Sequence, residues 1–593
     1  MLIVSTENEV NLWKRIVEME LVYLWVEEYK NIYKQGFNFS PRFDCEYIQG
    51  ELKVTDKKET KEPYLENFFG EDINITAIVG KNGSGKSNIL KALFQNADHR
   101  NFDEKLWYIL YDDDKKKLNI YFINDMKISK KKDISIKDTY CIEELKKDAE
   151  LLNKDSSLSK VELDFSMIYF SNMLQYLPIF NDEQNKSFSN ISISYLINKY
   201  SKEMKSDNFI EFKYQYNYYK SKIIEQTIIM LRDTNLKLDF ALPKELNIVI
   251  NTTYYSDKLE NVKQLITDEA DSFRLSAKLR IIYNYFTNSL NSNELKEQIG
   301  ENKPKLIEEL YNEIKIKVFL DDELDKFLVK LEDSKSNHTS IKISEINKDF
   351  LEKLKAFNST TECNNGISDI FHLNWRPELS SGQENYLFQF ASFYNILKKG
   401  SNLKKDIIIL IDEGETTMHP NWQKRYLKYY IDFFTENFKN ENKNIHIILT
   451  SHSPFILSDL PKENVIFLDK YKKDENQKEG NCKNVTKDMT MKPFGANIHT
   501  LLSDGFFMDG GLMGEFAKGK IQEILNFLDK EKNEKLKTIE KSQILPIIDS
   551  IGEDFLREKL LSMYFEKFPD EKQLDDKDIK IRELEKELAE LRK

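Results

Sequence analysis

The pattern of apolar and polar residues divides the chain into segments of different periodicity. Continuous apolar runs predict strands at residues 73–79, 106–111, 118–123, 161–170, 406–411 and 444–450. The run at 406–411 has the character of a strand that is buried on both faces in a parallel sheet, and residues 444–450 predict another buried strand. Residues 19–54 differ, because turn residues break their β-rich runs, and they predict two or three antiparallel strands.

Between residues 185 and 370 the pattern changes. Long polar stretches rich in Lys, Glu, Asn and Tyr carry apolar residues three to four positions apart, as at residues 223–231 and 306–316. This spacing predicts amphipathic helices. No heptad pattern is sustained over the length that a coiled-coil arm needs. We therefore expect a compact helical lobe.

These segments predict four parts in a chain of 593 residues, which is long enough for more than one core. Residues 1–184 and 371–490 are the two halves of one α/β domain with a mixed sheet. Residues 185–370 are a helical domain inserted between them, and residues 491–593 are a helical C-terminal region. Near its end, positions 581, 584, 588 and 591 make an apolar stripe too short to be stable alone. That helix needs a partner surface, within the chain or on another subunit.

Charge and composition narrow the class of protein. The net charge of −12 argues against a chain that coats nucleic acid along its whole surface, but it is compatible with a local basic patch. No run approaches the ~20 apolar residues needed to cross a bilayer, and the first residues lack the features of a signal peptide. We expect a cytoplasmic protein without a membrane partner. The cysteines lack CxxC spacing and indicate neither a zinc site nor a disulfide framework: Cys45, Cys141, Cys363 and Cys482.

The sequence GKNGSGKS, at residues 80–87, joins a predicted strand to a helical segment. A glycine-rich loop in this position can turn successive backbone N–H groups toward a phosphate, and the helix N-terminus adds its positive dipole end. Lys86 would bridge the β- and γ-phosphates, and the Ser87 hydroxyl would bind Mg²⁺. The expected ATP-binding residues are Gly80, Lys81, Asn82, Gly83, Ser84, Gly85, Lys86, Ser87 and Asn88.

Polar residues also follow two of the later strands. Asp412 and Glu413 end the run that begins at residue 406, and ligands bind at the C-terminal edge of a parallel sheet. Asp412 would hold Mg²⁺ through water, because Mg²⁺ dehydrates reluctantly. Glu413 would polarise the attacking water. His452 follows the next strand along the chain, two residues after it ends.

The sequence LSSGQ, at residues 379–383, precedes another helical segment. It is similar to the ABC signature LSGGQ, with Ser381 in place of the first glycine. A small residue still allows a backbone to approach a phosphate closely. Taken alone, the match also fits a cap for the following helix.

In this order, the phosphate loop, LSSGQ, the Asp412–Glu413 pair and His452 resemble the ABC-type ATPase heads of SMC proteins, their double-strand-break repair relatives, OLD nucleases and many bacterial defence ATPases. The resemblance implies that Lys86, Glu413 and His452 are catalytic, with His452 as a switch histidine donating to the γ-phosphate. It also implies a head-to-head dimer that sandwiches two ATP molecules. The signature residues that would act on the partner's ATP are Ser380, Ser381, Gly382 and Gln383.

The same resemblance places a γ-phosphate-sensing loop after the strand that ends at residue 170. Gln175 is the glutamine near this point, which makes it a candidate Mg²⁺ ligand.

The tail narrows the choice within these families. Residues 492–508 and 514–518 look like the segment after the switch histidine in PtuA-type ATPase subunits of Septu and retron-associated defence systems. That resemblance implies a PtuB-like HNH nuclease partner, and it brings nucleic acid, a retron reverse transcriptase and its DNA product among the expected partners. The alternative is that this aromatic segment only packs against the ATPase core.

Two functions follow from these resemblances. The first is an ATP-hydrolysing subunit of an antiphage defence complex, which controls a separate nuclease. The chain itself shows no HNH-type histidine cluster and no Toprim-like acidic constellation. The alternative is an SMC-like DNA-repair or chromosome-associated ATPase that binds DNA directly, and the lack of coiled-coil arms counts against it. A transporter motor would require membrane partners and gains nothing from the tail.

Overall fold

The structure is a computed structural model of the whole chain. It describes residues 19–70, 72–94, 106–112, 116–124, 127–134, 139–142, 165–173, 188–203, 212–234, 236, 238–250, 338–346, 351, 371–399, 403–438, 443–473, 475–506, 513–530, 532 and 534–569. The chain divides into two compact units, Met1–Phe507 and Met508–Lys593.

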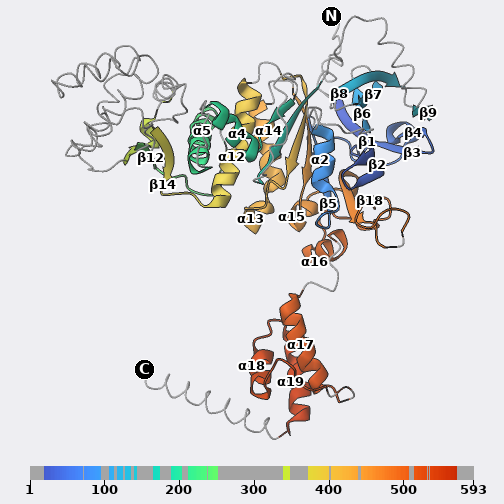
Figure 1. Cartoon of the computed structure of the whole chain (residues 1–593), viewed down its shortest axis with the longest axis vertical. Helices are drawn as coiled ribbons and strands as arrows, with labels where there is room; N and C mark the ends of the chain where they lie inside the picture. Colours follow the sequence, from blue (N-terminus) through green and yellow to red (C-terminus); the bar gives the residue numbers. More distant parts are fainter. Residues whose placement is uncertain are drawn as a thin grey trace, which may run out of the picture. The chain divides into compact units, whose positions relative to one another are not determined.

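Within the described ranges, seven strands of the first unit form its central sheet, in the order β11-β10-β15-β16-β5-β17-β18. Figure 1 labels β5 and β18 of this sheet. The strands from β11 to β17 pair in parallel, and β18 pairs antiparallel to β17. Every residue of β5, β10 and β16 is buried, including polar residues such as Thr76 and His446, as expected of strands that are covered on both faces. The strands are β5 (Ile73–Gly80), β10 (Phe165–Ser171), β11 (Phe188–Asn190), β15 (Asp406–Asp412), β16 (Asn444–Thr450), β17 (Val465–Lys470) and β18 (Cys482–Asn484).

An antiparallel sheet in the order β2-β1-β6-β7-β8 stands beside the central sheet. The N-terminal segment expected to hold two or three strands holds β1 to β4. The strands are β1 (Met19–Tyr29), β2 (Ile32–Asn38), β6 (Leu106–Asp112), β7 (Lys117–Asn124) and β8 (Lys127–Ile134), with a smaller sheet of β3 (Phe43–Ile48), β4 (Glu51–Asp56) and β9 (Thr139–Cys141). A short helix, α1 (Lys57–Thr60), follows β4.

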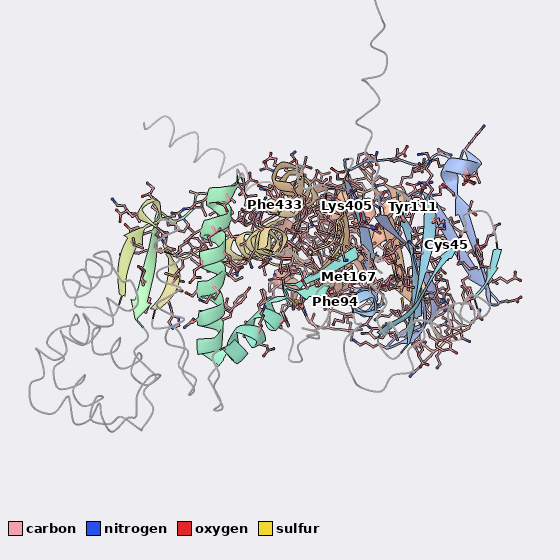
Figure 2. All side chains as sticks on the ribbon, turned by 90° about the horizontal axis from the view of Figure 1, so that it is seen from above. Cys45, Phe94, Tyr111, Met167, Lys405 and Phe433 are labelled. Atoms are coloured by element: carbon pink, nitrogen blue, oxygen red, sulfur yellow. The ribbon has the colours of Figure 1, made fainter. Side chains whose placement is uncertain are left out.

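Helix α2 (Lys86–Phe94) lies between these two sheets, and its apolar side chains join both in one core. Phe94 packs against Tyr169 of β10 with ring centroids 5.3 Å apart. Figure 2 shows Phe94 and Met167 in this crowded interior. The phosphate-loop helix is therefore fixed on two sides.

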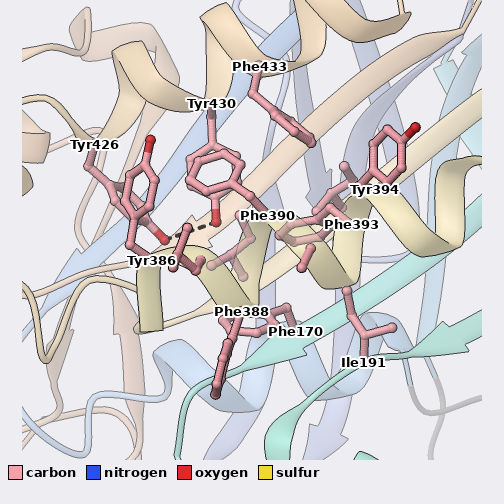
Figure 3. Packing of buried hydrophobic residues seen from close by; sticks show 14 of the residues in the cluster. Phe170, Ile191, Tyr386, Phe388, Phe390, Phe393, Tyr394, Tyr426, Tyr430 and Phe433 are labelled. Atoms are coloured by element: carbon pink, nitrogen blue, oxygen red, sulfur yellow. Dashed lines mark hydrogen bonds between the residues drawn. The ribbon is translucent and has the colours of Figure 1, made fainter. Parts of the chain in front are cut away.

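The helices on the other side of the central sheet form an aromatic core with it. Figure 3 shows Phe390 and Phe393 of α12 among Phe170 of the sheet and Tyr430 and Phe433 of the neighbouring helix. The helices are α4 (Ile193–Glu203), α5 (Phe212–Asp233), α12 (Ser381–Lys399), α13 (Pro420–Gln423), α14 (Tyr426–Phe438), α15 (Pro454–Ser458) and α16 (Ile498–Thr500), with 3₁₀ turns at Ile343–Glu345 and Lys462–Asn464 and a π turn at Leu501–Gly505.

The inserted segment contains strands as well as helices. Strands β12 (Glu245–Ile250), β13 (His338–Lys342) and β14 (Phe371–Arg376) form an antiparallel sheet in the order β13-β12-β14. The helix predicted at 223–231 is part of α5, whose buried residues belong to the main core. The helix predicted at 306–316 lies outside the described residues. The expectation of a purely helical lobe is therefore too narrow.

The second unit has a small core of its own. Helices α17 (Glu515–Leu528), α18 (Ile544–Asp549) and α19 (Asp554–Lys567), with a 3₁₀ turn at Lys541–Gln543, bury Ile524, Ile548 and Leu560. The helix expected at 581–591 lies outside the described residues. Residues 491–506 lie with the first unit, whereas the sequence placed them in the C-terminal region.

The predicted α/β fold class is confirmed: a sheet of parallel and antiparallel strands carries the phosphate loop, and helices cover the sheet. Where the structure describes the chain, no helix combines the length and the apolar character needed to span a membrane.

Candidate functional site

The phosphate loop has a backbone that only glycine accommodates at its key positions. Gly80, Gly83 and Gly85 have φ values of 152°, 73° and 107°, in the region that residues with a Cβ rarely adopt. A Cβ on Gly80 would also lie 2.1 Å from the carbonyl oxygen of Leu468 in β17. The close approach of β17 therefore requires glycine at the start of the loop predicted from GKNGSGKS.

Lys86, the first residue of α2, folds back over this loop. Its Nζ donates to the carbonyl oxygens of Gly80 at 3.0 Å and Lys81 at 3.2 Å. Burial lowers the pKa of Lys86 to about 8, and the nearby carboxylates of Glu413 and Asp412 offset part of this effect. A buried cation beside exposed loop residues is suited to receiving phosphate groups.

Hydroxyl groups from α2, β10 and β16 surround the Asp412 carboxylate at the end of β15. Its Oδ1 accepts hydrogen bonds from Ser87 at 2.8 Å and from Thr450 at 2.7 Å. Its Oδ2 accepts one from Tyr169 at 3.3 Å. The strand register places Ser171, Asp412 and Thr450 side by side. The Ser87 and Asp412 oxygens are the hard donors that Mg²⁺ prefers, so these two residues fit a metal shared with phosphate oxygens.

Glu413 begins the loop after β15 in a left-handed conformation, with φ of 50°. Its backbone N–H donates toward the backbone oxygen of Thr450 at 3.3 Å and the Thr450 hydroxyl at 3.1 Å. Burial and the charge of Asp412 raise the pKa of Glu413 above its usual range. A carboxylate with a raised pKa accepts a proton more readily, as expected of a group that orients and activates water.

The structure brings His452 to Glu413 across two strand ends. His452 Nε2 lies 3.6 Å from Glu413 Oε1. Burial and the charge of Lys86 lower the pKa of His452 to about 4, so its ring is neutral at pH 7. The ring also lies 6.4 Å from that of Phe506, measured between centroids. A neutral imidazole keeps one N–H that can donate to a phosphate oxygen.

Glu415 was missed by sequence reasoning, although it lies in the loop that follows Glu413. Its Oε1 accepts a hydrogen bond from the Ser451 hydroxyl and another from the backbone N–H of His452 at 3.3 Å. Burial raises the pKa of Glu415 to about 7. Glu415 thus holds the backbone that carries His452.

Asn31, in the hairpin between β1 and β2, is a second residue without a sequence signal. Its Nδ2 donates to the backbone oxygen of Gly83 at 3.1 Å, and its Oδ1 accepts from Asn88 at 2.7 Å. The hairpin therefore braces both the loop and the start of α2. Among the other predicted loop residues, Asn82 is exposed and Ser84 is buried.

The signature residues cap their own helix. Ser380 N donates to Gln383 Oε1 at 2.8 Å, and Gln383 N donates to Ser380 Oγ at 3.4 Å. Ser380 and Ser381 are exposed. Gly382 is required locally, because a Cβ there would lie 2.8 Å from the Thr417 carbonyl oxygen. The cap is confirmed, and the action of these residues on a partner's ATP stays a prediction. Gln175 lies outside the described residues.

Comparisons with known proteins agree with this site. A family model described as AAA ATPase domain matches residues 64–457. "Retron Vc95 probable ATPase" of Vibrio cholerae serotype O1 biovar El Tor is 21% identical over 414 residues, which are 67% of this chain and 69% of that protein.

Two solved structures are similar at low scores. The recombination mediator protein RecF with ATP has a TM-score of 0.23 and 14% identity, over 74% of this chain and 94% of its own. The SMC head bound to the C-winged helix domain of ScpA has a TM-score of 0.25 and 12% identity, over 79% of this chain and 99% of its own. At these TM-scores neither match carries an argument.

The matched range contains the phosphate loop, the Asp412–Glu413 pair and His452, and it covers well over half of the chain. This extent and the geometry of the site support ATP binding and ATPase activity. The chain belongs to the AAA ATPase domain family.

Proposed function

We propose that the chain is the ATP-binding and ATP-hydrolysing subunit of an antiphage defence complex, in which it dimerises through ATP and regulates an associated HNH nuclease. The observation that carries the ATPase part is the convergence of Lys86, Ser87, Asp412, Glu413 and His452 at one end of the central sheet. The defence part is supported by the relative that is named as a retron's probable ATPase and by the PtuA-like tail.

The contacts suggest how these residues divide the reaction. The loop N–H groups and Lys86 bind the phosphates. Ser87 and Asp412 would hold Mg²⁺, which would supply positive charge against the phosphates. Glu413 orients a water whose oxygen attacks the γ-phosphorus, while the bond from that phosphorus to the β–γ bridging oxygen breaks. His452 donates its N–H to a γ-phosphate oxygen. The products are ADP and inorganic phosphate.

Two substitutions test this division. Lys86→Ala should lose ATP binding, because the loop then has no buried cation for the phosphates. Glu413→Gln should keep ATP binding and lose turnover, because an amide cannot accept the proton of the water. Glu436→Gln is the matched control, since Glu436 is an exposed residue of α14. Nucleotide binding and phosphate release are measured for each protein. Undiminished hydrolysis by Glu413→Gln would refute the assignment.

The proposed dimer rests on the exposed Ser380 and Ser381 at the start of α12. Mixing Lys86→Ala chains with Ser380→Arg chains should restore part of the ATPase activity, because one composite site of the heterodimer then lacks both lesions. The measurement requires subunit exchange, which wild-type mixtures with two different tags can verify. Exchanged mixtures that stay inactive would argue against sites shared between subunits.

The nuclease partner is proposed to dock on the C-terminal region. Phe506 is 8% exposed and packs in the main core, so it belongs to the ATPase fold and is excluded as a docking anchor. Phe516, in α17, is 82% exposed and carries this proposal instead. Phe516→Glu should hydrolyse ATP normally and fail to co-purify with an HNH protein encoded beside it. Retention of that protein would place the docking surface elsewhere. ATP-dependent DNA binding by the chain alone would favour the SMC-like alternative.

A further inference from the structure

We infer that Asn385 and Gln389 are positioning residues that couple the signature helix to the water-activating Glu413. Both are buried on α12, one turn apart, and both side-chain amides donate to the backbone oxygen of Gly414, the residue after Glu413. The distances are 3.0 Å from Asn385 Nδ2 and 2.6 Å from Gln389 Nε2. This inference goes beyond the proposed function in assigning a role to the body of the helix.

The hydrogen bonds fix the orientation of each amide. Gln389 Oε1 accepts from the hydroxyls of Tyr426 and Tyr430, so its Nε2 must face Gly414. Gln389 Nε2 also donates to Asn385 Oδ1 at 2.9 Å. Asn385 Nδ2 makes a second bond, to the Thr417 hydroxyl at 2.8 Å. Figure 3 shows Tyr426 and Tyr430 together on α14. Their hydroxyl oxygens lie 3.3 Å apart.

The loop leaves no space for a different arrangement at Gly414. A Cβ on this residue would lie 2.1 Å from the Tyr426 hydroxyl oxygen and 3.1 Å from Gln389 Oε1. The backbone oxygen therefore sits where two donors converge, and the backbone itself touches α14. Displacement of α12 must move this peptide or break both bonds, because close-packed interiors transmit strain.

The same loop is held from the opposite side by the end of β16. Glu413 N–H donates to Thr450, and Glu415 accepts from the Ser451 hydroxyl and the His452 backbone N–H. The direction of the Glu413 side chain depends on a left-handed backbone between these two anchorages. The amides of α12 thus fix the Gly414 peptide, and this peptide helps to orient the Glu413 side chain.

If the signature contacts ATP bound to the partner, as the proposed function has it, then α12 connects the two ATP sites of the dimer. Ser380 and Ser381 begin α12, and Asn385 lies one turn further, about 6 Å along the helix axis. Contact of the signature with ATP in the partner would thereby adjust Glu413 in this chain. Hydrolysis at the two sites should be cooperative, since a coupling of this kind changes the response of one site to occupancy of the other.

The test uses Gln389→Met, which keeps the length of the side chain and removes its donors. Tyr430→Phe is a milder second variant, because it removes one hydroxyl that orients Gln389 and keeps the ring. Asn464→Leu is the matched control: its buried amide also donates to a main-chain oxygen, that of Ile75, but it lies at the opposite end of β5.

We expect kcat of Gln389→Met to fall about 10- to 100-fold, with the KM for ATP within about threefold and the Hill coefficient reduced toward one. Tyr430→Phe should show the same changes at smaller size, and Asn464→Leu should lose stability without changing the Hill coefficient. Wild-type-like kcat and cooperativity in folded Gln389→Met would overturn the inference. If Lys86→Ala loses hydrolysis and Gln389→Met does not, the inference about Gln389 is overturned and the proposed ATPase function still holds. Non-cooperative hydrolysis by the wild type would overturn the coupling between sites.

Discussion

Replacing Thr450 with valine tests how the active carboxylates are held. Thr450 is fully buried at the end of β16, and its hydroxyl donates to Asp412 and accepts from the Glu413 backbone N–H. Valine has nearly the same shape and lacks the hydroxyl. Glu413 N–H keeps a partner, the backbone oxygen of Thr450 at 3.3 Å. Asp412 keeps its bonds from Ser87 and Tyr169. The variant should therefore fold and lose one specific support.

The expected magnitude follows from the charge of the acceptor. A hydrogen bond to a charged group contributes about 1.5–3 kcal/mol. If Ser87 turns from Asp412 to Mg²⁺ when the nucleotide binds, Thr450 becomes the remaining support for Asp412 Oδ1. A loss of about 2 kcal/mol in the transition state corresponds to a fall of roughly 30-fold in kcat/KM. The Mg²⁺ concentration for half-maximal activity should rise as well, because the carboxylate is less well oriented.

The assay is phosphate release at several Mg²⁺ concentrations, with urea unfolding of the same protein. Thr227→Val is the matched control, because Thr227 is a buried threonine of α5 whose hydroxyl donates within its own helix, to the Ile223 oxygen at 2.7 Å. It should hydrolyse ATP like the wild type. Hydrolysis by Thr450→Val within threefold of the wild type at every Mg²⁺ concentration would refute the reasoning.

Three further predictions concern other parts of the first and second units. Gly80→Ala should abolish ATP binding, because its Cβ would meet the Leu468 oxygen at 2.1 Å; nucleotide titration measures this, and normal affinity would contradict it. Burial lowers the pKa of His446 to about 3, below its value in the unfolded chain. Between pH 7 and 5 the histidine is therefore protonated in the unfolded chain and stays neutral in the folded one. This difference lowers the free energy of unfolding of the wild type by about 2 kcal/mol. The gap in unfolding free energy between wild type and His446→Gln should narrow by that amount in urea titrations at the two pH values; a constant gap would show that His446 titrates normally. Phe506→Glu should unfold the first unit, whereas Phe516→Glu should leave its melting temperature unchanged; equal melting temperatures for the two variants would contradict the burial argument.

The sequence alone was sufficient for features that depend on neighbouring residues in the chain. Three glycines in GKNGSGKS predicted a loop that turns its backbone N–H groups toward a phosphate, and the structure has positive φ at Gly80, Gly83 and Gly85. The apolar run before Asp412 predicted a buried parallel strand ending at that carboxylate. The order of motifs also predicted the α/β class. These features are local because backbone sterics and the apolar pattern of a buried strand are both encoded within a few consecutive residues.

Tertiary structure decided which distant residues meet. Thr450 and Tyr169 reach Asp412 because β16 and β10 flank β15 in the sheet. Asn31 reaches the phosphate loop from a hairpin about fifty positions earlier in the sequence, and Gly414 receives amides from α12. Strand order, register and helix packing depend on many contacts between segments far apart in sequence, and no spacing within one segment encodes them. For the same reason the aromatic content of the tail could not distinguish the buried Phe506 from the exposed Phe516.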